Sequence, residues 1–316
     1  MRICKVRRLQ KEISTSKLSW SVAALTTLLL WFVAWLEDHV TFLPFVLLMV
    51  SGLLMMWMNH LFALIRVYSR MIASSFLAFN MAFLMAPDIG GMQLQVTFMQ
   101  FCVIVFLILF FSCYQYRRAQ GVILYAFLMI GLASLVFKQI LFLVPILWLL
   151  TGYCMVTFSV KILLSSIFGV SLPYVFLLTY YFMVGTPLEE WTLVHNWNFC
   201  HTFDFSGIKM QVMLAFVCAS VLSIIGMSHL IHEGHRDKVR TRMMYQIFFA
   251  LFLFSFAMTL LQPANMLMFT ALQLIATSAM IGHFFALTDT KRTNVVFITI
   301  LSLTYIITLF NLIYTS

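Results

Sequence analysis

Residues 159–185 read SVKILLSSIFGVSLPYVFLLTYYFMVG, and residues 186–207 read TPLEEWTLVHNWNFCHTFDFSG. After a single cation, Lys161, the first segment is apolar for the length of a bilayer-crossing helix, which needs about 20 apolar residues. Gly169 and Pro173 lie within this run. Because proline in a helix interior removes a backbone hydrogen bond, we expect a kink or break there. The second segment is the longest polar loop of the chain, and on either side apolar runs alternate with short polar turns.

The composition of the whole chain is that of a membrane protein. It has 316 residues, of which 63% are hydrophobic and 9% are charged, whereas soluble domains carry about 25% charged residues. One soluble core of this size could not hide so much apolar surface, so lipid must surround most of the chain. We predict an all-α, polytopic transmembrane bundle of about eleven spans. The predicted spans are residues 19–36, 40–58, 71–86, 94–113, two within 122–158 that meet at Lys138, 162–185, 208–230, 243–261, 266–287 and 293–313.

Around these spans the sequence predicts one transmembrane domain. Residues 1–18 form a basic cytoplasmic N-terminus. Residues 19–313 form the domain itself, with a long external loop at 186–207 and a basic cytoplasmic loop at 232–242. The start of the chain is similar to a signal peptide, but its apolar run is long for one and no small-residue cleavage site follows. We therefore expect a retained first span.

Basic residues predict the orientation of the bundle. If the loops alternate sides, all of the 19 lysines and arginines except Lys138 and Lys209 fall on the side of the N-terminus. Lysine and arginine accumulate in cytoplasmic loops, so the N-terminus is predicted inside and the C-terminus outside. The net charge of +9 is explained by this topology, and nucleic acid is not expected as a partner.

The external loop carries the densest set of reactive side chains. Histidines and carboxylates can transfer protons or ligate a metal, and exposed Trp191 and Trp197 suit stacking against a sugar or a partner protein. The interpretation we favour is an interfacial loop, with aromatic side chains at headgroup level and carboxylates in water. The catalytic candidates here are Glu189, Glu190, His195, His201 and Asp204.

Two further groups of polar residues are candidates for ligand binding. His229, His232 and His235 recur every three residues, so two of them could share a cation on a helix, but no fourth ligand is evident and we predict neither a metal nor a cofactor. Arg66 and Arg70 are spaced four apart in a segment, Leu61–Arg70, that we predict to be a short interfacial helix. Such arginines would face lipid headgroup phosphates.

Charge placement also bears on transport. A proton-coupled transporter needs ionisable groups inside the membrane, and none of the ten acidic residues falls within a predicted span. His283 lies near a helix end. Asn80 and Gln273 are internal, and lone amides of this kind usually join helices to one another. The sequence therefore favours an apolar or lipid substrate over a proton-coupled one.

Two short patterns resemble a known family. They are Asn59…Arg66 after the second span and Lys161-x6-Phe168-Gly169-x3-Pro173-Tyr174 in the seventh. Both are similar to multi-pass inner-membrane proteins of the Bacteroidota, a family without an assigned chemistry. The resemblance implies a bacterial inner membrane and a role in building the cell envelope.

These observations predict a non-enzymatic role in cell-envelope biogenesis. The protein would be a membrane partner of an assembly, either an envelope protein or a lipid-linked one, or a carrier of an apolar or lipid substrate. The alternative is a polymerase-like membrane glycosyltransferase that acts on lipid-linked glycans at the outer face. Such enzymes place a catalytic acid in their first external loop, where this chain has Glu37 and Asp38. They also rely on external arginines, and none is predicted here.

Overall fold

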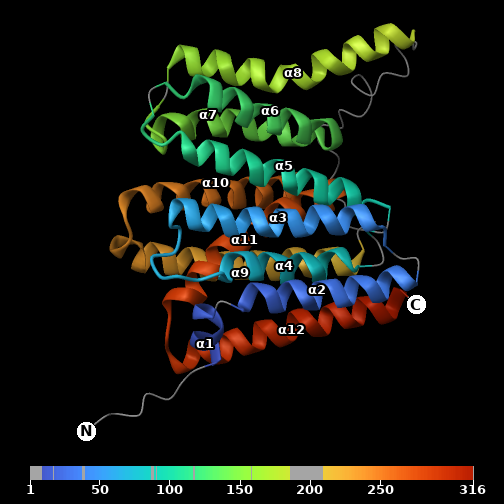
Figure 1. The fold of residues 1–316 in the computed structure, drawn as a ribbon, viewed down its shortest axis with the longest axis vertical. Helices are drawn as coiled ribbons and strands as arrows, with labels where there is room; N and C mark the ends of the chain where they lie inside the picture. The colour runs from blue at the N-terminus through green and yellow to red at the C-terminus, as the bar shows by residue number, and fades with distance from the viewer. Residues whose placement is uncertain are drawn as a thin grey trace.

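The structure is a computed structural model that describes residues 9–16, 18–37, 40–86, 89, 91–116, 118–157, 159–185 and 209–315. Residues 313–315 are described by their backbone alone. Within these residues every regular element is a helix, and the long helices lie side by side along one direction (Figure 1). The elements are α1 (Leu9–Thr15), α2 (Ser19–Leu36), α3 (Phe42–Phe62), α4 (Met71–Leu84), α5 (Gln93–Ser112), α6 (Gln120–Val136), η2 (Lys138–Phe142), α7 (Leu143–Tyr153), α8 (Val160–Val184), α9 (Met210–Glu233), η4 (Gly234–Arg236), α10 (Val239–Leu261), η5 (Pro263–Asn265), α11 (Met266–Leu287) and α12 (Lys291–Thr315).

Eight helices of the described chain are long and apolar enough to cross a membrane, and three shorter apolar helices accompany them. Each of the eleven predicted spans overlaps one of these helices, and the turn predicted at Lys138 is the start of η2. The short ones are Met71–Leu84, Gln120–Val136 and Lys138–Tyr153. A helix of the length of α4 rises about 21 Å, less than the roughly 30 Å hydrocarbon layer. The all-α membrane bundle is thus confirmed with eight spans, and the other three stay a prediction.

Helix α11 forms the centre of the bundle. Of its apolar stretch, 83% is buried, against 17% for α2 and for α12 and 22% for α8. It packs against α4, α5, α9 and α10. The outer helices therefore present their apolar side chains to lipid, while the polar side chains of α11 are enclosed by protein.

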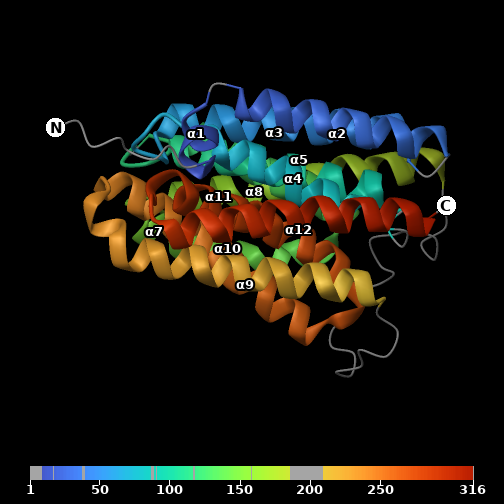
Figure 2. The same ribbon diagram turned by 90° about the horizontal axis from the view of Figure 1, so that it is seen from below.

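The loops predicted to be cytoplasmic meet at one end of the bundle, which we call the basic end. Helix α1 lies near this end, and α12 ends at the opposite end (Figures 1 and 2). Four contacts tie the loops together: Lys11 Nζ to Asp289 Oδ2 at 3.0 Å, Arg66 Nη1 to Asp237 Oδ1 at 3.9 Å, the Arg240 guanidinium 5.3 Å above the Phe62 ring, and Gln115 N to Met155 O at 3.0 Å. These contacts hold the loops of the basic end against one another.

The interfacial helix predicted for Leu61–Arg70 is wrong. Helix α3 ends at Phe62, Ala63 adopts a left-handed conformation with φ of 49°, and residues 64–70 form an irregular loop. Leu64 and Ile65 fill the protein core at 0% and 5% exposure, so the apolar residues of this segment do not face lipid. Arg66 and Arg70 therefore do not share a helix face.

Helix α8 is continuous from Val160 to Val184 with Pro173 inside it, so the predicted break is absent. Its ribbon changes direction midway along its length, as expected of a proline kink (Figure 1). The proline ring packs against Gly131 of α6, where a Cβ atom would lie 3.0 Å from Pro173 Cγ. Pro173 thus removes one backbone hydrogen bond from α8 and makes a close contact between α8 and α6.

Candidate functional site

Most of the predicted catalytic candidates lie outside the described residues. Glu37 is the exception: it is exposed at the C-terminal end of α2, away from the basic end. The candidates about which the structure says nothing are Asp38, Glu189, Glu190, His195, His201 and Asp204.

The three spaced histidines do not come together. The His229 ring turns into the bundle, 5.7 Å from that of His283. His232 and His235 are exposed, and His235 Nδ1 lies 2.9 Å from the backbone oxygen of His232. Across the part of the chain that the structure describes, no three histidine, cysteine, aspartate or glutamate side chains group so as to hold a metal ion.

A buried charge cluster at the basic end is the strongest candidate site. We call Arg66, His229, Asp237, Tyr245 and His283 the Asp237 cluster. The Asp237 side chain is 4% exposed, with Oδ2 3.1 Å from His283 Nε2 and Oδ1 3.9 Å from Arg66 Nη1. His283 is fully buried, and its ring lies 4.9 Å from that of Tyr245 in an edge-to-face arrangement. Buried charges are costly unless paired, and here each has a partner.

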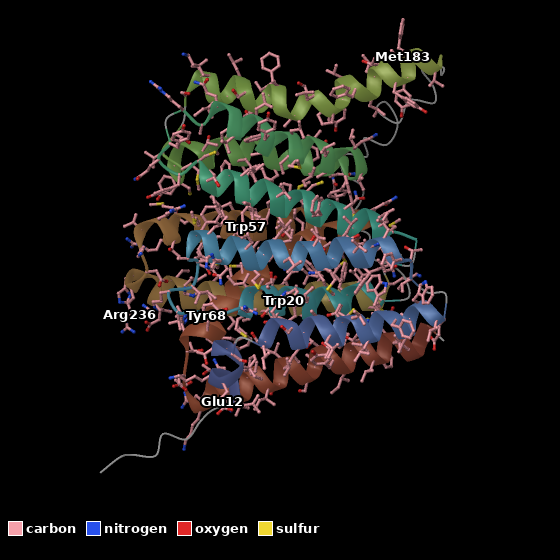
Figure 3. The ribbon with its side chains drawn as sticks, in the orientation of Figure 1. Glu12, Trp20, Trp57, Tyr68, Met183 and Arg236 are labelled. Carbon is pink, nitrogen blue, oxygen red and sulfur yellow. The ribbon has the colours of Figure 1, made fainter. Side chains whose placement is uncertain are left out.

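Five separate segments build this cluster. Its members come from the 63–70 loop, α9, the turn before α10, α10 itself and α11. Helix α9 ends at Glu233, and the η4 turn with its hydrogen bond from Asp237 N to Gly234 O directs the aspartate inward. Figure 3 shows Tyr68 and Arg236, each near a cluster residue in sequence, at the same end of the bundle. The site therefore depends on the packing of distant segments.

The 63–70 loop is held in place by Asn59. Its Nδ2 donates to Ser69 O at 2.8 Å, and its Oδ1 accepts from Ile65 N at 3.2 Å. One side chain thus fixes both ends of the segment that carries Arg66 toward Asp237.

We expect Asn59→Ala to lower the free energy of unfolding by about 1–3 kcal/mol, because two loop groups lose their partner. His60→Ala, which changes the neighbouring exposed side chain, is the matched control and should have little effect. Denaturant titration of the purified protein in detergent measures both. Equal stability of the two variants would show that the loop does not need the clamp.

The ionisation of the Asp237 carboxyl depends on the groups that surround it. Burial raises the pKa of the Asp237 carboxyl, but the hydrogen bond from His283 and the positive charge of Arg66 lower it by more, so this pKa lies below its usual range. Asp237 is therefore ionised at neutral pH. With Arg66 as its fixed counter-charge, the remaining protonation states belong to the two imidazoles.

Three polar atoms of the cluster have no hydrogen-bond partner among the described residues. They are Tyr245 Oη, His283 Nδ1 and His229 Nε2. Leaving a buried polar group unpaired costs about 1–3 kcal/mol, and native structures rarely leave several together. Such a concentration around one ring is typical of a functional site.

Polar side chains continue from the cluster along α11. Gln273 Nε2 donates to Ser220 Oγ of α9 at 2.9 Å, and Thr277 and Ser223 hydroxyls lie 2.7 Å apart. Gln100 Nε2 of α5 donates to Asn80 Oδ1 of α4 at 2.6 Å and to Ala271 O of α11 at 2.8 Å. The prediction that Asn80 and Gln273 join helices is confirmed.

Two apolar clefts flank α12. Figure 2 shows α12 between α2 and α9, and α12 packs on α4. The α2–α12 cleft, about 400 Å³, is bounded near the basic end by Ser16, Ser74 and Phe285. The α9–α12 cleft, about 500 Å³, is bounded by Ala215, Leu222 and Ile307 and reaches Gln211 and Asn311 toward the other end. No described aspartate, glutamate, lysine or arginine lines either one.

Comparison with known proteins returns no match to a family model, to a curated protein or to a solved structure. The structure establishes a multi-pass integral membrane protein whose apolar helices contact a lipid bilayer.

Proposed function

We propose that the protein is a non-enzymatic carrier of a lipid or another long apolar substrate in the bacterial inner membrane, in the service of envelope biogenesis. The basic end faces the cytoplasm in this proposal, by the tendency of lysine and arginine to stay inside. All eleven apolar helices cross the membrane, so that the C-terminus is external. The inner membrane and the envelope role rest on the resemblance of the 59–66 and 161–174 segments to Bacteroidota proteins.

The observation that supports carriage is the arrangement of the two clefts. Along α4 the two clefts occupy opposite halves, with the α2–α12 cleft nearer the basic end. Along α12 they overlap, because the α9–α12 cleft extends from Val296 to Asn311. Both are lined by Phe79, Ile300 and Thr304, so they adjoin midway. Their volumes are in the range of ligand pockets, about 300–1,000 Å³. Two adjoining apolar clefts that together follow α12 over most of its length suit a lipid chain that moves along this helix.

Helix α12, between the clefts, makes polar contacts with α1, α2 and α4, and in the first of these Gln10 N donates to Asn294 Oδ1 at 3.0 Å. The Tyr305 and Thr26 hydroxyls lie 3.1 Å apart, and Asn311 Nδ2 donates to Ala82 O at 3.0 Å. The outward face of α12 is exposed, with Ile306 at 61% and Val295 at 62%. Without a hydrophobic force between helices in lipid, such a helix depends on packing and a few hydrogen bonds. A lipid chain can therefore enter beside α12, because its apolar contacts with the helix replace those that it displaces.

An assembly partner or an enzyme would use other features. A glycan-handling enzyme needs carboxylates that converge on a groove, and neither cleft has a charged lining residue in the described chain. The described clefts therefore favour an apolar substrate.

Photolabelling tests the carrier. The full chain is reconstituted with phosphatidylglycerol that carries a photoreactive group in its acyl chain, and the label is mapped by mass spectrometry. We expect several-fold more label on residues 214–225 of α9 than on the exposed face of α8, which meets only bulk lipid. Ala215→Trp, which fills the α9–α12 cleft, should abolish this excess.

Val295→Trp is the matched control, because it places the same side chain on the exposed face of α12 outside both clefts. It should leave the labelling pattern unchanged. Equal label density on α9 and α8 in the unmodified chain would overturn the carrier proposal.

A further inference from the structure

We propose that the Asp237 cluster is a proton-binding site, with Nδ1 of His283 as the proton acceptor, and that the bound proton is coupled to movement of the substrate past α11 and α12. Proton binding stands on the geometry of the cluster alone. The coupling rests on the proposed carrier function.

The hydrogen bond to Asp237 fixes which nitrogen of His283 is basic. Neutral imidazole carries one N–H and one lone pair. Because a carboxylate only accepts, Nε2 of His283 must be the donor to Asp237 Oδ2 at 3.1 Å. The lone pair is therefore on Nδ1, which has no hydrogen-bond partner among the described residues. A proton from the solution that binds there leaves an imidazolium beside an ionised carboxylate, an arrangement that stabilises the charged ring.

The charged and titratable groups around this part of α11 come from the segments packed against it. The 63–70 loop contributes Arg66, α9 contributes His229 with Glu233 behind it, the turn contributes Asp237 and α10 contributes Tyr245. Helices α4 and α5 carry no acidic or basic residue. Helix α1 contributes Lys11, which pairs with Asp289. With neutral imidazoles the charges of Arg66 and Asp237 cancel, so one proton changes the net charge of the cluster from zero to positive.

A proton can reach the site from the basic end. The Arg66 side chain is 39% exposed while the carboxylate beside it is 4% exposed, so the arginine lies between solution and the buried ring. On the far side, His229 Nε2 and Tyr245 Oη are the unpaired groups next to His283. Histidines, carboxylates and hydroxyls in sequence are the usual components of membrane proton relays.

The cluster is also placed to move the substrate clefts. Asp237 joins the 63–70 loop and the α9–α10 turn to α11. Two residues beyond His283, Phe285 lines the α2–α12 cleft, and Leu274 of the same helix lines the α9–α12 cleft. Protonation of Nδ1 adds a positive charge to the ring and strengthens the bridge from α11 to Asp237, whereas in the neutral state this bridge is one hydrogen bond from Nε2. The two states hold α11 differently, and each favours a different access to the clefts.

Nitrogen NMR of the histidine-labelled full chain in lipid nanodiscs tests proton binding. The sample is titrated from about pH 8 to pH 5, where imidazoles change charge, and we expect the doubly protonated His283 signals to grow at the expense of the singly protonated ones. Asp237→Asn, which keeps the shape and removes the charge, should reduce the doubly protonated share at each pH. Asp289→Asn, which removes an aspartate that is 31% exposed and paired with Lys11, is the control and should leave it unchanged.

His283→Gln assigns the signals. If that variant does not fold, removal of the six other histidines leaves only His229 and His283 to give signals; these are His39, His60, His195, His201, His232 and His235. A His283 ring that stays in one form over the whole range, or that responds equally to both aspartate variants, would overturn the proton site.

Coupling is measured separately by photolabelling at the two ends of the same pH range. We expect label on the α9–α12 cleft to change several-fold with pH in the unmodified chain and in Asp289→Asn, and to become independent of pH in Asp237→Asn. Label that is present but unaffected by pH would overturn the coupling and leave the carrier intact. Absence of cleft label would overturn the carrier and the coupling with it, while the NMR titration still decides proton binding.

Discussion

Replacement of Asp237 by alanine is expected to lower the free energy of unfolding by about 1–3 kcal/mol, the usual cost of leaving a buried hydrogen-bond donor without its partner. The variant leaves His283, which is fully buried, without the acceptor for its Nε2. It also leaves Arg66 without its counter-charge. Denaturant titration in detergent measures the loss.

Asp289→Ala is the control for this experiment. Asp289 pairs with Lys11 at 3.0 Å, but these side chains are 31% and 50% exposed, and exposed pairs contribute about 0–1 kcal/mol. A second variant, Asp237→Ala with His283→Leu, removes both buried partners and should recover much of the loss, since replacing both members of a pair can be nearly neutral. If Asp237→Ala and Asp289→Ala lowered the free energy of unfolding equally, the burial of Asp237 would make no special contribution to stability.

The same pair gives the stability a defined pH dependence. Because its native pKa lies below the usual range, Asp237 stabilises the fold fully above its unfolded pKa of about 3.9. This contribution is lost as the pH falls through the lower native pKa, because the protonated carboxyl can no longer hold the charges around it. Asp237→Asn should lack this acid-dependent loss, while Asp289→Asn should retain it.

Much of the fold follows from the sequence for a simple physical reason. In lipid every backbone group must be paired within its own segment, so apolar runs of sufficient length become helices. The boundaries of α2, α8 and α11 agree with the predicted spans to within a few residues. The basic loops lie at one end because successive helices run in opposite directions, so that every second loop is on the same side.

The candidate site could not be predicted in this way. Asp237 stands between Arg236 and Lys238 in a charged loop, and that pattern is typical of a solvated segment. Its burial depends on His283, 46 positions further along the chain, and on a loop that the sequence suggested was an interfacial helix. The absence of acidic residues from the spans argued against proton chemistry, yet a turn between two spans can be enclosed by its neighbours. The clefts, too, arise from the packing of α4, α9 and α12, and no short sequence pattern predicts how these helices pack.

Gly169→Ala is expected to detach α8 from the bundle, with a loss at or above the top of the range of about 1–3 kcal/mol typical of overpacking. A Cβ atom at this position would lie 2.5 Å from the backbone oxygen of Leu124 and 3.0 Å from Phe127 Cβ. A backbone atom cannot move away by a rotamer change as a side chain can, so α6 and α8 must separate. Helix α8 has little else to hold it, because only 22% of its apolar stretch is buried and it packs chiefly against α6.

Separation of α8 has a distinct signature. The Ser134 and Tyr174 hydroxyls, 2.7 Å apart across the same contact, would part, and a bifunctional thiol crosslinker would join cysteines introduced at the two positions less efficiently. Gly121→Ala on α6 is the matched control, since nothing lies within 4 Å of its added Cβ atom. Alanine favours a helix over glycine by about 0.5–1 kcal/mol, so this variant should be as stable as the unmodified protein or more so. If Gly169→Ala matched Gly121→Ala in stability and in crosslinking, close approach of the two backbones would not be what holds α8 in place.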